Sequence, residues 1–252
     1  MSAISKAVIP AAGLGTRMYP ISKYLPKPML PLGKKPVLQH IVEELEEVGI
    51  DEIAIVARTE HQAIFGYFDD HPAITIVEDN TASGPGGAIL KTEEFVDGED
   101  FMVVFSDAPI QGKGRAKHLK KLIGSKYKYE AKAALSIYRI PKEEVSSRGV
   151  VTFVEQEPSG EVVKLNDMLE KPPKSTVESR WASACRYILD ADIIQALRGV
   201  KTEKGERQLT PAIRQMLHQG HSMVGLPIPK DLHRYDTGNF EGYFEAFNDF
   251  TE

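Results

Sequence analysis

The sequence is poor in the features that mark secreted, membrane-spanning or metal-clustered proteins. Its 252 residues include one cysteine, Cys185, which excludes an intrachain disulfide and a cysteine-based zinc cluster. No apolar run approaches the roughly 20 residues that a membrane-spanning helix needs. The first residues enter a strand pattern directly and do not resemble a signal peptide. These absences favour a cytoplasmic protein that has no membrane partner.

Neither sign of charge is in large excess. Lysine and arginine total 31 against 36 aspartates and glutamates, which gives a net charge of -5. Broad binding to duplex nucleic acid needs a basic face, so we expect no nucleic-acid partner, although a local basic pocket is compatible with this balance. The 42% of hydrophobic and 27% of charged residues are typical of a soluble globular protein. The chain length suits one large α/β domain or two small ones.

Short apolar runs alternate with helical patterns through the first half of the chain. The runs predict strands over 3–10, 53–57, 73–77 and 101–105. Between them, apolar residues at helical spacing predict helices over 36–49 and 60–68. This alternation is typical of βαβ units, so we expect a mostly parallel sheet with helices on both faces.

The second half of the chain has a less regular pattern. Three segments alternate as half-exposed strands do: 131–139, 150–155 and 162–165. A further strand is expected over 181–189, and helices are expected over 190–198, 210–218 and 239–250. We expect Thr210 to cap its helix, with Pro211 in the first turn. Because no linker interrupts the chain, residues 1–252 are predicted to form one domain in which the later strands extend the sheet or cover it.

The strongest chemical signal is the loop after the first strand, AAGLGTR, which is followed by KPMLP. Its glycines let backbone N–H groups approach a phosphate closely. The loop is not a dinucleotide fingerprint, because Met18 stands where a third glycine belongs, and it lacks the Gly-Lys-Ser/Thr of a P-loop. Two cations, Arg17 and Lys27, precede the first helix. Together with the glycines, they predict a site that holds a triphosphate at more than one phosphate.

These residues and others in the same order resemble the sugar-1-phosphate nucleotidyltransferases, especially their bacterial UDP-glucose pyrophosphorylase branch. The resemblance covers nearly the whole chain and is most specific in the first loop. Its further segments are GPGGA (84–88), FSD (105–107), RGVV (148–151), EKP (170–172), CRY (185–187), ERQLTPAI (206–213) and DTGN (236–239). It implies a Rossmann-like, mostly parallel mixed sheet flanked by helices, with a small sugar-binding β extension. Residues 1–112 would form the nucleotide-binding half and residues 113–252 the sugar-phosphate-binding half.

The resemblance also implies a reaction. A sugar 1-phosphate, with glucose 1-phosphate as the expected substrate, would attack the α-phosphorus of UTP in line and release pyrophosphate. The attacking phosphate is already anionic near neutral pH, so no general base is needed. The work is to position two anions that repel each other and to neutralise their charge. Mg²⁺ is the implied cofactor, and a homodimer or homotetramer is the implied assembly.

The site residues follow from the same resemblance. The nucleotide would be bound by Ala11, Ala12, Gly13, Gly15, Thr16, Asp79 and Gly84, and the sugar phosphate by Gly149, Glu170, Lys171 and Glu206. Arg17, Lys27, Asp107 and Lys171 are the expected catalytic residues. Asp107 follows an apolar strand, where ligands gather at the carboxyl edge of a parallel sheet. Asp107 and Asp236 would hold the Mg²⁺, since that ion prefers oxygen ligands.

Two positions depart from the family pattern. Cys185 stands where the family usually has glycine, and we expect it to be a small core residue. Asp79 stands where the uridylyl and thymidylyl enzymes carry a base-reading glutamine. An ionised aspartate only accepts hydrogen bonds, so it could take the N3–H of uracil or favour a base rich in donors such as guanine. Glu78 and Asn80 are also candidates, because the loop alignment is open by about one residue.

Several alternatives stay open at this point. One is a thymidylyl-, cytidylyl- or guanylyltransferase that acts on another sugar 1-phosphate. Another is a non-catalytic regulatory protein that binds sugar nucleotides on the same fold, since a fold does not fix a function. A glycosyltransferase would normally show an Asp-x-Asp motif where this chain has Ser106-Asp107-Ala108. A nicotinamide dehydrogenase is disfavoured by the missing third glycine.

Overall fold

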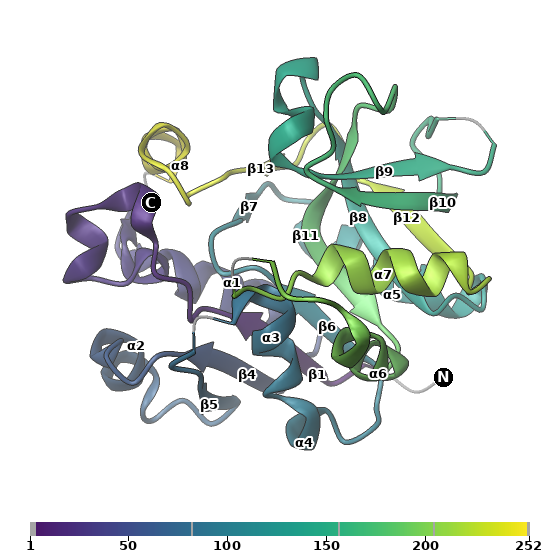
Figure 1. The fold of residues 1–252 in the computed structure, drawn as a ribbon. Coiled ribbons are helices and arrows are strands. Elements are labelled where there is room, and N and C mark those ends of the chain that lie inside the picture. Colours follow the sequence, from purple (N-terminus) through teal and green to yellow (C-terminus); the bar gives the residue numbers. More distant parts are fainter. Residues whose placement is uncertain (1–3, 82, 156, 204, 251–252) are drawn as a thin grey trace.

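One mixed sheet runs through the molecule and carries helices on both of its faces (Figure 1). The structure is a computed structural model that describes residues 4–81, 83–155, 157–203 and 205–250. Within these residues the sheet has nine strands in the order β5-β4-β1-β6-β11-β8-β12-β10-β9. Their bounds are β1 (Lys6–Pro10), β4 (Glu52–Ala57), β5 (Ile74–Glu78), β6 (Phe101–Val104), β8 (Ala133–Arg139), β9 (Gly149–Phe153), β10 (Val163–Glu170), β11 (Trp181–Leu189) and β12 (Met223–Pro227).

The sheet changes character between its two halves. In the first half β1 pairs in parallel with both β4 and β6, and β4 pairs in parallel with β5. Strand β11 runs antiparallel to β6 and β8, and β10 runs antiparallel to β12 and β9. The carboxyl ends of β1, β4 and β6 therefore share one edge, beside the point where the parallel half meets β11.

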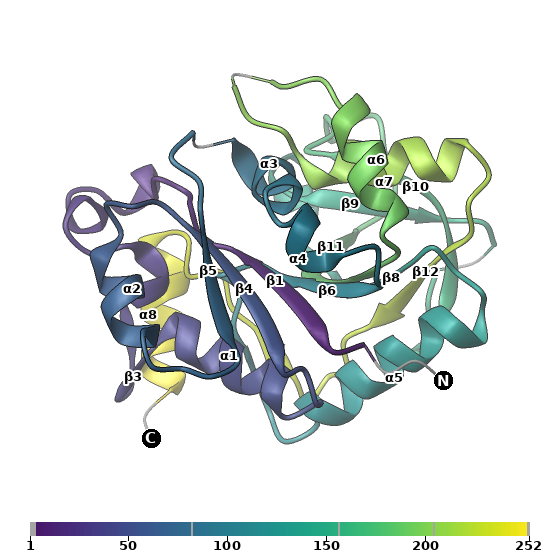
Figure 2. The same ribbon diagram turned by 90° about the horizontal axis from the view of Figure 1, so that it is seen from below.

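Two sets of helices bury the two faces of the sheet (Figure 2). The first set is α1 (Val37–Glu46), α2 (Gln62–Phe68), α5 (Arg115–Lys128) and α8 (Phe240–Asp249). The second set is α3 (Gly84–Leu90), α4 (Glu93–Val96), α6 (Asp192–Gly199) and α7 (Leu209–His218). Among the described residues, no helix combines the length and the apolar character that a bilayer crossing requires.

Short elements complete the fold. The 3-10 helices are η1 (Thr16–Met18), η2 (Ile21–Lys23), η3 (Lys27–Met29) and η4 (Lys142–Ser147). The two-stranded pairs are β2 (Pro31–Leu32) with β3 (Lys35–Pro36), and β7 (Ile110–Gln111) with β13 (His233–Arg234). The β7–β13 pair brings the chain after Asp107 alongside the chain before Asp236.

The predicted α/β class, its parallel first half and its helices on both faces are confirmed. The prediction that the later strands extend the sheet is also correct. The half-exposed character predicted for 131–139 is wrong, because β8 lies between β11 and β12 and residues 133–137 are buried. Thr210 is not a cap either. Helix α7 begins at Leu209 after Gln208, and Thr210 is buried within its first turn.

A buried ion pair joins strand β11 to helix α1 near the site. Arg186 on β11 is 0% exposed and donates from Nε (2.9 Å) and Nη2 (2.6 Å) to the Glu44 carboxylate on α1. Its Nη1 also donates to the carbonyl oxygens of Ala108 and Ala184. Arg186 therefore ties α1 and β11 to the segment that immediately follows Asp107.

Candidate active site

A cavity of about 690 Å³ opens at the carboxyl edge of the parallel strands. Segments from all along the chain line it, including the first loop, the start of α3, the segment after β6 and the segment before α8. The structure brings together all but one of the predicted site residues: Ala12, Gly13, Gly15, Thr16, Arg17, Lys27, Asp79, Gly84, Asp107, Gly149, Glu170, Lys171, Glu206 and Asp236. Ala11 does not line the cavity, since its side chain is buried and its N–H donates to Val56.

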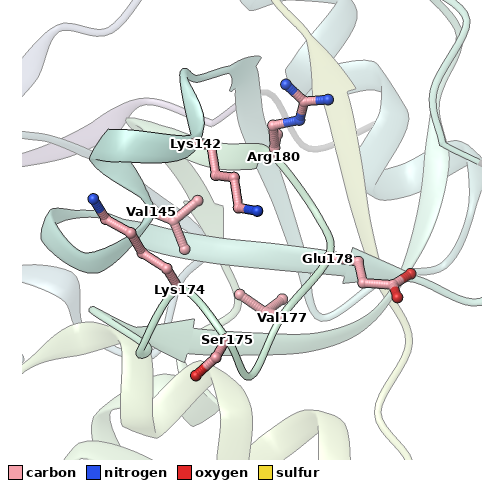
Figure 3. A pocket seen from close by; sticks show the side chains of 7 residues that line it. All are labelled: Lys142, Val145, Lys174, Ser175, Val177, Glu178 and Arg180. Carbon is pink, nitrogen blue, oxygen red and sulfur yellow. The ribbon is translucent and has the colours of Figure 1, made fainter.

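A smaller groove of about 390 Å³ lies elsewhere, between η4 and the segment that precedes β11 (Figure 3). Of the described residues, it shares none with the main cavity. Its lining consists of Lys142, Val145, Lys174, Ser175, Val177, Glu178 and Arg180. The predicted chemistry therefore gathers in the larger cavity and not in this groove.

The first loop wraps one side of the cavity because Gly15 lets it turn. Gly15 has a φ of 63°, in the left-handed region that glycine enters without strain. A Cβ there would lie 3.2 Å from the Cβ of Ser22, whose hydroxyl donates to the Gly15 carbonyl at 2.8 Å. The turn leads directly into η1, which carries Arg17, and η3 then supplies Lys27. Both cations predicted from the loop thus reach the cavity.

Asp107 and Asp236 face each other across the backbone of Gly238. A Cβ on Gly238 would lie 3.0 Å from Asp107 Oδ2, 3.1 Å from Asp236 Oδ1 and 2.9 Å from an Arg17 nitrogen. The absent side chain leaves a gap toward which an oxygen of each carboxylate projects. The backbone N–H of Gly238 also donates to Asp236 Oδ1 at 3.1 Å. Two carboxylates that are 129 residues apart in the chain are thereby brought to one point, as the resemblance implied.

Each of the two carboxylates already has a cation as partner. Lys27 Nζ pairs with Asp107 Oδ2, and Arg148 Nη1 pairs with Asp236 Oδ2. Burial alone would raise the pKa of Asp107, but the charges of Lys27, Arg234 and Arg17 outweigh it and hold this pKa below its ordinary value. Burial opposes ionisation of Asp236 as well, yet its pKa is lowered by the charge of Arg234 and by the bond from Arg148. Both groups are therefore anionic at neutral pH.

The sequence analysis assigned no role to two cavity arginines, Arg148 and Arg234. Arg234 lies on β13, where its guanidinium stacks over the ring of Tyr138 and donates to Cys185 Sγ at 3.6 Å. Burial would lower the pKa of Arg234, but nearby groups, including Asp236 and Asp107, raise it above its ordinary value. The one signal in the sequence for this residue is that it lies two positions before Asp236; the structure adds that its strand pairs with the segment after Asp107.

Cys185 interrupts β11 beside the cavity. It has a φ of 63°, a conformation that glycine adopts more readily, and the register of β11 against β8 shifts between Ser183 and Tyr187. This explains why the resemblance places a glycine there. Cys185 lines the cavity and is not simply a core residue, and burial raises the pKa of its thiol.

Three of the predicted sugar-phosphate residues lie together where β9 begins and β10 ends. A Cβ on Gly149 would lie 3.2 Å from Thr210 Oγ1 and 3.7 Å from Glu170 Oε2. Lys171 Nζ lies 3.3 Å from Glu170 Oε1, and its side chain is 57% exposed. Glu206 instead lies beside Gly84, in a segment joined to the start of α3 by backbone bonds between Arg207 and residues 83 and 86.

Asp79 lines the cavity, but its carboxylate is bonded within its own turn. Oδ1 accepts from the backbone and the hydroxyl of Thr81, and Oδ2 accepts from the hydroxyl of Ser83 at 2.6 Å. Burial would raise its pKa, but these bonds lower it overall. Asp79 is 1% exposed. Its predicted contact with the base remains a prediction.

Comparison with known proteins agrees with this geometry. The family model described as Nucleotidyl transferase matches residues 6–252. A UTP–glucose-1-phosphate uridylyltransferase of Mycoplasma pneumoniae is 34% identical over 98% of this chain and 92% of its own. One of Bacillus subtilis is 30% identical over 99% and 92%. A crystal structure of UDP-glucose pyrophosphorylase complexed with UDP-glucose superposes with a TM-score of 0.88, at 33% identity and 98% coverage of each chain. A UTP-bound enzyme of Acinetobacter baumannii gives 0.87 at 27% identity, covering 98% of this chain and 93% of its own.

A mixed α/β sheet that gathers a glycine-rich loop, two carboxylates and several cations at its carboxyl edge, together with these relatives, indicates a transferase of nucleotidyl groups. The chain belongs to the nucleotidyl transferase family. The resemblance predicted from its motifs is confirmed, as is the prediction that it is an enzyme of this class.

Proposed function

We propose that this protein transfers the uridylyl group of UTP to glucose 1-phosphate, giving UDP-glucose and pyrophosphate. The observation that carries the proposal is the convergence of Asp107, Asp236 and Arg17 on the gap at Gly238, with Lys27 bound to Asp107. The two relatives named above are UTP–glucose-1-phosphate uridylyltransferases, and this chain matches each of them over nearly its full length. The first loop and the predicted sugar-phosphate residues line the same cavity as this gap, so a nucleotide and a sugar phosphate could meet there.

The residues at the gap fit Mg²⁺. Carboxylate oxygens are the ligands that this ion prefers, and it commonly uses one or two of them together with water and substrate phosphates. The described part of the chain holds no cluster of three or more metal-ligating side chains, which is compatible with a site that the substrate completes. Asp107 and Asp236 would hold the ion. When bound, Mg²⁺ would neutralise charge on the phosphates and favour in-line displacement.

In this mechanism the chain's own cations bind the phosphate groups of both substrates. Lys27 would bind the triphosphate near its α-phosphate, and Arg17 would bind the departing β- and γ-phosphates. Lys171 would hold the sugar phosphate, and Glu170 would accept hydrogen bonds from sugar hydroxyls. A phosphate oxygen of the sugar 1-phosphate forms the new bond to the α-phosphorus of the triphosphate. The bond between the α-phosphorus and the oxygen that links it to the β-phosphorus breaks, and pyrophosphate leaves with that electron pair.

The proposal is tested by measuring pyrophosphate release with Mg²⁺. Five nucleoside triphosphates are combined with glucose, galactose, mannose and N-acetylglucosamine 1-phosphates. We expect the highest kcat/KM with UTP and glucose 1-phosphate. Activity confined to GTP and mannose 1-phosphate would contradict the uridylyl assignment while leaving the family intact.

Two variants test the assigned residues, and a third variant serves as their control. Lys27→Ala and Asp107→Ala should each lower kcat by at least about 100-fold, the typical cost of losing one preorganised charge at a transition state. Lys23→Ala is the matched control, because Lys23 follows the same loop but is exposed and stacks over Tyr19. Wild-type turnover in either of the first two variants would remove that residue from the mechanism.

A further inference from the structure

Arg148 contacts a proposed metal ligand, yet the mechanism above gives it no task. It follows η4 and lines the cavity, where 23% of its side chain is exposed. Its Nη1 donates to Asp236 Oδ2, and its Nε (3.1 Å) and Nη2 (2.9 Å) donate to Glu144 Oε2. Its carbonyl accepts from the N–H of Lys171 at 3.0 Å. Arg148 therefore links the metal-binding side of the cavity to the sugar-phosphate side.

We propose that Arg148 competes with a divalent cation for Asp236. In the free protein the guanidinium of Arg148 is bonded to the carboxylate that the cation would use. An anionic substrate binds the guanidinium and so breaks this bond. Metal and anionic substrate then bind cooperatively. This inference rests on the proposed function, because it assumes that Asp236 is a metal ligand.

The hydrogen bonds of Asp236 support competition for its charge. Oδ1 borders the gap and accepts from the backbone N–H of Gly238, and Oδ2 accepts from Arg148. An ion in the gap would therefore bind the oxygen next to the one that Arg148 holds. A guanidinium and a divalent cation carry the same sign of charge, so a guanidinium on one oxygen of a carboxylate opposes a divalent cation on the other. Release of Arg148 by Asp236 removes this repulsion.

The charges around the gap explain why an anion would make the exchange favourable. Asp107, Asp236 and Glu144 supply three negative charges, while Arg17, Lys27, Arg148 and Arg234 supply four positive ones. A divalent cation alone therefore enters a site with an excess of positive charge. A phosphate reverses that balance, and guanidinium groups bind phosphate in a bidentate manner. Because Glu144 holds the other edge of the guanidinium, Arg148 would stay at the cavity wall after Asp236 releases it.

The test measures Mn²⁺ binding by electron paramagnetic resonance, with Mn²⁺ in place of Mg²⁺ and with no nucleotide present. Arg148→Gln should bind Mn²⁺ about 10-fold more tightly than the wild-type protein, since the competing charge is gone. The gain should disappear in the double variant Arg148→Gln with Asp236→Asn. Arg180→Gln is the matched control, because it removes one arginine charge from the separate groove in Figure 3 and should leave Mn²⁺ affinity unchanged.

A second measurement addresses the anion. Binding of glucose 1-phosphate to the metal-free protein, measured by calorimetry, should weaken about 10-fold in Arg148→Gln. Arg148→Lys keeps the charge, so its Mn²⁺ affinity should stay close to that of the wild type even if its stability falls. This variant separates the effect of the charge from a general disturbance of the fold.

Two outcomes would overturn the inference. One is a folded Arg148→Gln protein that binds Mn²⁺ no more tightly than the wild type. The other is a gain in affinity that persists when Asp236 is replaced as well. Pyrophosphate release by the wild-type protein tests the proposed function independently, so unchanged Mn²⁺ affinity together with intact release would remove the role of Arg148 alone.

Discussion

The sharpest test of the site is to fill the gap at Gly238 with one methyl group. In Gly238→Ala the new Cβ would lie about 3 Å from an oxygen of Asp107, an oxygen of Asp236 and a nitrogen of Arg17. Real Cβ atoms almost never show the 2.9 Å contact with Arg17, and the contacts of 3.0 and 3.1 Å with the two carboxylates are tighter than most, so all three side chains must give way by a few tenths of an ångström. The methyl group also occupies the point toward which both carboxylates project. The substitution therefore acts on the proposed metal site directly.

The expected loss of activity can be estimated from this geometry. Mg²⁺ requires oxygens at about 2.0–2.1 Å in near-ideal octahedral geometry, so it tolerates little displacement of its ligands. Misplacing a reacting group by about 1 Å can lower a rate about 100-fold. That factor corresponds to about 3 kcal/mol in activation free energy. We therefore expect kcat for pyrophosphate release to fall at least about 100-fold.

The fold should tolerate the same change. The three crowded groups are side-chain ends at the edge of a cavity, so we expect a loss of about 1 kcal/mol in the free energy of unfolding, the lower end of overpacking costs. Gly124→Ala is the control. Its Cβ meets no atom within 4 Å on α5, so it should gain about 0.5–1 kcal/mol from helix propensity and keep full activity. Wild-type kcat in a folded Gly238→Ala enzyme would refute the assignment of the gap as the metal position.

Three further predictions concern stability. Arg186→Met should lower the free energy of unfolding in urea by about 3–5 kcal/mol, because it leaves the buried Glu44 carboxylate unpaired; a loss under 1 kcal/mol would contradict this. Burial, and then the charges of Arg186 and Lys121, lower the pKa of His118 from 6.5 to about 4. The unfolded chain therefore binds this proton more tightly than the folded protein does. The free energy of unfolding should fall as the pH drops from 6.5 to 4. Wild-type protein should lose up to about 3 kcal/mol more than His118→Gln across that window, and equal losses would show that His118 is not the group responsible. Gly242→Ala should be more destabilising than Gly238→Ala in thermal melts, because its Cβ would clash with the backbone carbonyl of Asp236, which cannot swing aside; an equal or higher melting temperature would contradict this.

The parts of the fold that the sequence predicts are those with a strong local pattern. The apolar runs of β1, β4 and β6 are buried parallel strands, β5 is a partly exposed parallel strand at the sheet edge, and α1 has a clear apolar stripe. The sequence analysis assigned no helix to α5, whose exposed face is rich in lysine and whose buried contacts are few. It also missed β12, a five-residue run that contains a glycine and ends in proline. Both elements are fixed by packing against β8, which no local pattern reveals.

The candidate site divides in the same way. The loop from Gly13 to Lys27 is continuous in sequence, so its glycines and cations directly predict a phosphate site. Asp107 and Asp236 could be paired only through the family resemblance, because their meeting depends on the β7–β13 pair and on the missing side chain at Gly238. The ion pair between Arg148 and Asp236 joins residues 88 positions apart, and no spacing rule predicts it.

The two ion pairs at the gap suggest why the chemistry should depend on simultaneous occupancy. Lys27 and Arg148 each neutralise one of the carboxylates, so the free site keeps its acids ionised without a metal. The same cations are then available to phosphates once the carboxylates have another partner. An exchange of this kind keeps buried charges paired at every stage, which avoids the several kcal/mol that an unpaired buried ion costs. The exchange also accounts for the number of cations, which exceeds that of the proposed metal-binding carboxylates. Two cations neutralise Asp107 and Asp236 in the free protein. The full set would then hold two phosphate groups together during the reaction.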